Sequence, residues 1–218
     1  MGGNYLRRDA LKEDLKMKKN SLRQFLLAGV FILLISSAVS AATSETLNLS
    51  AYVPDAVSGL TITVNKIRAS DNAIVETGSN PALNLADFTV DAVNNILTSP
   101  YYYSVDVQVN DNTSSNWSFI HQVSSIQRDA QNNLDENISV TFLTQLQTFP
   151  GGNTLIKRSF KSSNVNLSKS MLPGGQLRII YGVATGDANN DAPNTTPVSI
   201  SKASGTYTGS VLLTLVTY

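Results

Sequence analysis

Several residue types that carry chemistry in proteins are rare or absent in this chain of 218 residues. The chain has no cysteine, which excludes thiol catalysis, thiolate metal sites and disulfides. A single histidine, His121, excludes a multi-histidine metal site. No long stretch shows the apolar spacing of an amphipathic helix, whereas Asn, Ser, Thr and Val are abundant. The composition therefore favours strands and turns, held together by core packing alone.

Residues 17–42 have the three-part pattern of a secretory signal peptide. Lys18 and Lys19 give a positive start, residues 25–35 are almost all apolar, and residues 38–42 supply small side chains for cleavage. A membrane anchor is the alternative, but the apolar run is shorter than the about 20 residues that a spanning helix needs. We therefore predict an exported protein, extracellular, on the cell surface or periplasmic, with no stable membrane span after cleavage.

The chain is expected to contain one folded domain. Residues 1–16 precede the signal pattern, which normally opens a chain, so we interpret them as a start site placed too early or as a disordered segment. Residues 43–218 are long enough for a single domain with a real core. They carry nine Lys and Arg against thirteen Asp and Glu, a net charge of −4. This charge predicts no nucleic-acid partner.

Short stretches of alternating apolar and polar residues follow one another through this domain. Strands are expected at residues 46–53, 60–67, 73–77, 83–90, 95–99, 101–110, 116–123, 138–146, 154–160, 164–170, 176–184 and 207–218. The polar residues 128–136 and 186–197 are expected to be loops. The pattern predicts an all-β, antiparallel, immunoglobulin-like β-sandwich of about eight to ten strands, with a barrel as the competing architecture.

Few residues are candidates for chemistry. Asp187, Asn189 and Asp191 alternate within one loop and are weak candidates for calcium ligands, with a polar turn as the alternative. His121 shares a strand face with Trp117 and is expected to be a partly buried structural histidine. No nucleophile–base signature is present. We therefore predict that the protein is not an enzyme and uses no cofactor.

The aromatic and the acidic residues each allow two interpretations. Tyr101, Tyr103 and Trp117 form either an exposed platform for sugars or part of the core, and a tryptophan in a strand often anchors a sandwich core. The carboxylates that could form catalytic pairs are expected to lie in turns or on polar strand faces, where they are solvated: Asp87, Asp91, Asp106, Asp135 and Glu136.

Both ends of the domain show strand patterns. In the first expected strand one face carries Leu47, Leu49, Ala51 and Val53. In the last, both faces are largely apolar, so we expect a strand buried between neighbours with Tyr218 near an end of the core. One of its faces carries Val211, Leu213 and Leu215.

With the export signal, these ends resemble a pilin-like family, the subunits of the spore coat protein U and fimbrial type. Members open on a short strand ending in Val-Pro, as at Val53 and Pro54, and close on a motif matched here by Gly205, Tyr207, Val211 and Tyr218. The resemblance covers about 30 residues at the two ends. It implies polymerisation by donor-strand complementation, in which an extension of one subunit fills a groove in the next.

The predicted function is therefore an exported structural subunit of a surface appendage or coat, whose partners are copies of itself or other surface subunits. Residues 46–53 would be the donor, with Leu47, Leu49, Ala51 and Val53 as its plugs, unless they form the protein's own first strand. The competing function is a monomeric secreted binding module, for example for carbohydrate, that uses strand-face aromatics or the loop of residues 186–197. A secreted hydrolase ranks below both.

Overall fold

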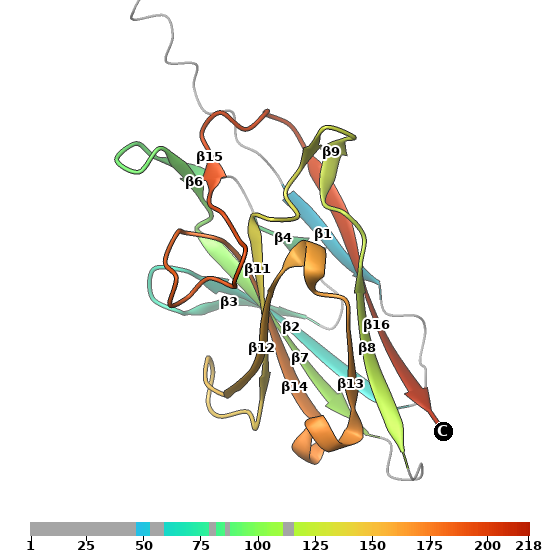
Figure 1. Ribbon diagram of the computed structural model, residues 1–218. Helices are drawn as coiled ribbons and strands as arrows, with labels where there is room; N and C mark the ends of the chain where they lie inside the picture. The colour runs from blue at the N-terminus through green and yellow to red at the C-terminus, as the bar shows by residue number, and fades with distance from the viewer. Residues whose placement is uncertain (1–46, 53–58, 79–81, 86–87, 111–115) are drawn as a thin grey trace, which may run out of the picture. The chain divides into compact units, whose positions relative to one another are not determined.

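The computed structural model describes residues 47–52, 59–78, 82–85, 88–110 and 116–218, and for residues 47–52 it gives the backbone pairing alone. Within these ranges it contains sixteen strands, ten of them with four or more residues, and three short 3-10 helices. No helix among the described residues is long and apolar enough to cross a membrane. The prediction of an all-β sandwich is confirmed (Figure 1).

One layer is a six-stranded sheet in the order β12-β11-β14-β7-β2-β3, in which every neighbouring pair is antiparallel. Its strands are β2 (Leu60–Arg68), β3 (Ile74–Gly78), β7 (Tyr101–Val109), β11 (Ile138–Thr144), β12 (Asn153–Ser159) and β14 (Gln176–Val183). The sheet ends in two different strands rather than closing on itself, which makes this layer half of a sandwich and not a barrel.

The other layer is a seven-stranded sheet built around the long last strand, β16 (Tyr207–Thr217). On one side β16 pairs with β8 and β9, and on the other with β1, which also pairs with β4. The β1–β16 pair is parallel, so the prediction of a wholly antiparallel sheet is wrong at this one pair. The remaining bounds are β1 (Leu47–Tyr52), β4 (Ala82–Asn84), β8 (Trp117–Val123), β9 (Gln127–Asp129), β10 (Asn132–Asn133) and β13 (Val165–Ser168).

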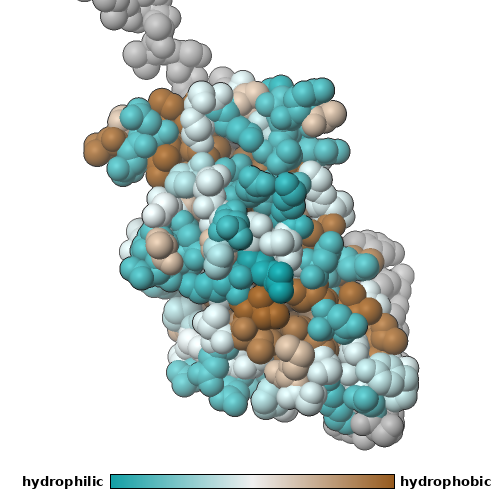
Figure 2. Space-filling model, in the orientation of Figure 1, coloured by the Kyte–Doolittle hydropathy of each residue, from teal (hydrophilic) through white to brown (hydrophobic). Residues whose placement is uncertain are grey.

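A small third sheet extends from one end of the sandwich. It consists of β5 (Thr89–Asp91), β6 (Ile96–Thr98) and β15 (Val198–Ser199). Val90 and Val93 in its β5–β6 hairpin are 46% and 89% exposed, and Figure 2 shows hydrophobic colour at this hairpin. The same view shows a second hydrophobic area in its lower half, surrounded mostly by hydrophilic residues. Three helical turns complete the fold: η1 (Phe160–Ser162), η2 (Lys169–Met171) and η3 (Pro173–Gly175).

The core lies between the two main sheets and follows from the alternation of each strand. On β7 the buried side chains that belong to the core are Tyr103, Val105, Val107 and Val109, which alternate along the strand. On β8 Trp117 is 2% exposed and belongs to the same core cluster. The prediction that this tryptophan anchors the core is confirmed.

Two predicted elements are wrong. The expected strand at residues 83–90 is two short strands, β4 and β5, which belong to different sheets. The expected loop at residues 128–136 contains the β9–β10 hairpin, in which Asp129 accepts hydrogen bonds from the backbone amides of Gln131 and Asn132. Leu134 follows that hairpin and is fully buried. A side-chain-capped turn without glycine or proline gives a weak signal in sequence, which explains the second error.

The last strand is placed between neighbours as predicted, but only one of its faces is buried. Val211, Leu213 and Leu215 are at most 5% exposed, whereas Val216 is 40% and Tyr218 65% exposed. The sheet packs on its partner through one face and meets solvent with the other, so the prediction of two buried faces is wrong. Tyr218 lies near the end of the sheet, where its hydroxyl is 3.0 Å from that of Ser118.

Candidate functional site

The predicted assembly strand is an internal strand of the seven-stranded sheet. Six residues of β1 pair in register with β16, from Leu47 opposite Tyr207 to Tyr52 opposite Leu212. Three further pairs join β1 to β4. Because β1 supplies a ladder on each side, its loss would leave β16 and β4 with unpaired backbone groups.

The register also places the predicted plugs. Leu47, Leu49 and Ala51 occupy positions opposite Tyr207, Gly209 and Val211. This row of β16 positions points to the core, since Tyr207 and Val211 are at most 1% exposed. Val53, the fourth predicted plug, lies outside the described residues. In the single chain, β1 therefore pairs with β16 and β4 of its own sheet.

His121 is fully buried and links the two sheets. Its Nδ1 is 2.7 Å from the carbonyl oxygen of Ser163, and its Nε2 is 2.8 Å from the hydroxyl of Tyr181 on β14. A carbonyl can only accept, so Nδ1 carries the proton and Nε2 accepts from Tyr181. Burial lowers the pKa of His121 to about 4, which keeps the ring neutral. The histidine has no room for substrate and acts as a core residue.

The calcium candidates lie in a polar turn whose backbone is capped by its own aspartates. Asp191 accepts hydrogen bonds from the backbone amides of Thr185 and Gly186, and Asp187 accepts from that of Asn189. The ammonium of Lys157 donates to the carbonyl oxygen of Asn189 at 2.8 Å. Within the part of the chain that the structure describes, no three acidic or histidine side chains gather as a metal site would require. These contacts match the polar-turn interpretation.

The other predicted candidates do not come together. Tyr103 and Trp117 are each 2% exposed, so the exposed aromatic platform is wrong. The carboxylates have separate structural tasks. Asp91 accepts a hydrogen bond from the amide of Val93 in its own turn, and Asp135 accepts one from the amide of Ile126. Two carboxylates form ion pairs, Glu136 with Lys161 and Asp106 with Arg178. Asp87 lies outside the described residues.

The outer face of the six-stranded sheet, opposite the core, carries a buried ion pair. Arg178 is 5% exposed and binds both carboxylate oxygens of Asp106, at 2.6 and 2.8 Å. The loop between β11 and β12 covers this pair. Phe149 stands 5.0 Å from the guanidinium, and the carbonyl oxygen of Gly151 accepts a hydrogen bond from it.

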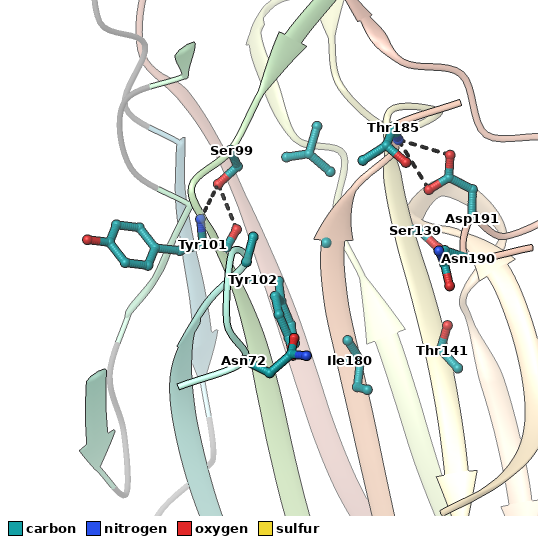
Figure 3. Close-up of a pocket in the computed structure, with 13 residues that line it drawn as sticks. Asn72, Ser99, Tyr101, Tyr102, Ser139, Thr141, Ile180, Thr185, Asn190 and Asp191 are labelled. Carbon is teal, nitrogen blue, oxygen red and sulfur yellow. Dashed lines mark hydrogen bonds between the residues drawn. The ribbon is translucent and has the colours of Figure 1, made fainter. Parts of the chain in front are cut away.

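Beside this cover, a pocket of about 480 Å³ opens on the same outer face (Figure 3). Strands β7, β14 and β11 form its floor, the β2–β3 turn forms one wall, and the loop after β14 forms the opposite wall. In Figure 3 Asn72 and Tyr102 lie on one side of Ile180, and Thr141 and Asn190 lie on the other. The residues that line it are Ala69, Asn72, Ser99, Tyr101, Tyr102, Ser139, Thr141, Ile180, Gly182, Val183, Thr185, Asn190 and Asp191.

Sequence reasoning missed this pocket, although one signal was present. Gly182 interrupts the apolar strand β14, and a glycine inside a strand often marks a place where a ligand or backbone approaches closely. The other lining residues come from segments far apart in sequence. Asn72 and Asn190, for example, are brought to the same opening only by the order of strands in the sheet.

Comparisons with known protein families, with curated proteins and with solved structures find no match to this chain.

Proposed function

We propose that the protein is an exported structural subunit of a surface appendage or coat, and that its copies join by exchanging β1. The supporting observation is the position of β1. It is an internal strand with ladders to β16 and β4, yet a single segment, residues 53–58, connects it to the later strands.

Exchange of such a strand between copies changes the free energy little. A β1 from a neighbouring copy makes the same two ladders and fills the same row opposite Tyr207, Gly209 and Val211. The closed and linked forms therefore make the same strand pairs, and the concentration of subunits decides which form prevails. A high local concentration at a cell surface favours the linked form by mass action. The signal-peptide pattern of residues 17–42 is consistent with that location.

The absence of cysteine allows a direct test. Ser50 and Ser210 are opposite each other in the β1–β16 register, so Ser50→Cys and Ser210→Cys together introduce one disulfide between adjacent strands. If β1 comes from a neighbour, this bond links different subunits. We then expect a ladder of covalent oligomers on a non-reducing gel after boiling, which collapses to monomer with reductant.

The single variants serve as controls, because Ser50→Cys or Ser210→Cys alone can give at most a dimer. A cross-linked monomer without a ladder, from surface-sheared material as well as from purified protein, would show that each chain keeps its own β1. That result would reject the proposed function.

A further inference from the structure

We propose that the pocket on the outer face of the six-stranded sheet binds a neutral saccharide unit. The pocket lies on the face of that sheet directed away from the seven-stranded sheet and shares no residue with β1 or β16. The inference therefore does not rest on strand exchange, and either proposal can fail without the other.

The lining is rich in uncharged hydrogen-bonding groups. Apart from Tyr101, whose ring points away, seven of the thirteen lining residues carry a hydroxyl or a carboxamide, and none of the thirteen carries a positive charge. The only charged residue, Asp191, already accepts the backbone amides of Thr185 and Gly186. Such a lining suits a ligand with many hydroxyl groups and no net charge, and it offers an anion no cationic partner.

Several of these groups have unused hydrogen-bonding capacity. Tyr102 donates its hydroxyl proton to Oδ1 of Asn72 at 2.9 Å, which leaves its oxygen able to accept and Nδ2 of Asn72 able to donate. Among the described residues, the hydroxyl of Thr141 has no hydrogen-bond partner. The hydroxyl of Ser139 accepts from the amide of Ala192 and can still donate. Donors and acceptors therefore face the pocket from both of its sides (Figure 3).

An apolar surface completes the recognition site. The ring of Tyr102 and the side chain of Ile180 line the pocket among the polar groups, whereas the ring of Tyr101 points away from it (Figure 3). A pyranose ring combines C–H faces with hydroxyl edges, and a tyrosine offers an apolar body with a polar tip. The volume of about 480 Å³ lies within the range of small-molecule sites.

The walls are already fixed by bonds within the protein. Asp71 accepts from Arg68 and from the amide of Ala73, which holds the turn that carries Asn72. On the opposite wall, Lys157 donates to the carbonyl oxygen of Asn190 at 3.3 Å. A preformed site needs little ordering on binding, which favours recognition of a small ligand.

Gly182 gives the pocket its depth and provides the sharpest test. A Cβ added at Gly182 would meet only the Cβ of Tyr102, at an ordinary contact distance of 3.6 Å. Gly182→Val therefore fills the floor of the pocket while keeping a residue type that strands favour. Thr141→Val removes one unpaired hydroxyl and preserves the shape of the side chain. Thr63→Val is the matched control, since Thr63 is on the same sheet but does not line the pocket.

The experiment measures binding of glucose, galactose, mannose, N-acetylglucosamine and their neutral oligomers to the purified protein by NMR titration, with glucuronic acid and glucosamine as charged probes. We expect a neutral sugar to bind. Gly182→Val should then weaken binding at least ~10-fold, and Thr141→Val about fivefold, the loss of one neutral hydrogen bond. Thr63→Val should bind as the unmodified protein does.

Three results would overturn the inference. The first is that no neutral sugar binds at roughly 100 mM, far above a dissociation constant of about 1 mM for a weak site. The others are that the protein prefers a charged probe, or that Gly182→Val binds the neutral sugar as tightly as the unmodified protein does. If Gly182→Val fails to fold, as judged by circular dichroism, the test is the ratio of the sugar dissociation constants of Thr141→Val and Thr63→Val. Equal binding by those two variants would then reject the site.

Discussion

The two faces of the six-stranded sheet are both largely covered, but by different means. The inner face packs against the seven-stranded sheet with apolar side chains such as Val105, Phe142 and Ile179, each at most 1% exposed. The outer face carries polar groups, including Ser104 and Arg178, which are at most 5% exposed.

The difference shows that alternation decides which residues face the core, but not which become buried. Arg178 is buried on the polar face because the loop after β11 folds over it and because Asp106 neutralises it through two hydrogen bonds. A charge loses its hydration only where such partners replace the water. Farther along the same face, where this cover ends, the pocket remains open.

The largest effect is expected on the inner face. Phe142→Ala removes a fully buried ring from the core and should lower the free energy of unfolding by about 4 kcal/mol. Ile180→Ala is the counterpart on the outer face, where the side chain is half-buried, and should cost about 1 kcal/mol. Denaturant unfolding measures both. Similar losses for the two variants would mean that the faces contribute equally and would contradict the comparison.

A second effect concerns the one titratable ring between the sheets. Burial lowers the pKa of His121 from its usual 6.5 to about 4, so the unfolded chain binds a proton that the folded chain does not between these values. The contribution of neutral His121 to the free energy of unfolding should be fully present above pH 6.5. The free energy of unfolding should fall by about 3 kcal/mol as the pH drops to about 4.

Unfolding in urea across this pH range, compared with His121→Gln, tests the prediction. The variant lacks the titrating group and should lose most of the slope between pH 6.5 and 4, whatever its absolute stability. The exposed Asp129, whose pKa is lowered to about 2 chiefly by its hydrogen bonds from Asn132 and Arg128, titrates below this window. An unchanged slope in His121→Gln would assign the pH dependence to other groups.

The smallest of the three effects is expected from the ion pair under the loop. Arg178→Met leaves Asp106 without its partner and should lower the free energy of unfolding by about 2 kcal/mol. This loss is smaller than for a fully buried pair, because the Asp106 side chain is 26% exposed. The double variant Asp106→Leu and Arg178→Met should regain part of this loss, because no unpaired charge remains. A double variant that is less stable than Arg178→Met alone would show that the carboxylate has other stabilising partners, such as Ser104.

Sequence reasoning located most long strands because each carries a local period of two. β2, β7, β8 and β14 begin where the pattern begins, or within one residue of it. It failed where the deciding contact is distant or where the turn has no glycine or proline. The β9–β10 hairpin depends on the side chain of Asp129, and the break between β4 and β5 follows from their pairing with different sheets.

The sequence by itself determined the all-β class and the positions of most long strands, because these follow from residue type and alternation. Only the tertiary structure decided the parallel pairing of β1 with β16, the cover over Arg178 and the pocket above Gly182. Each of these requires segments distant in the sequence to meet, and a period of two within one strand does not specify which partner lies beside it or what covers it.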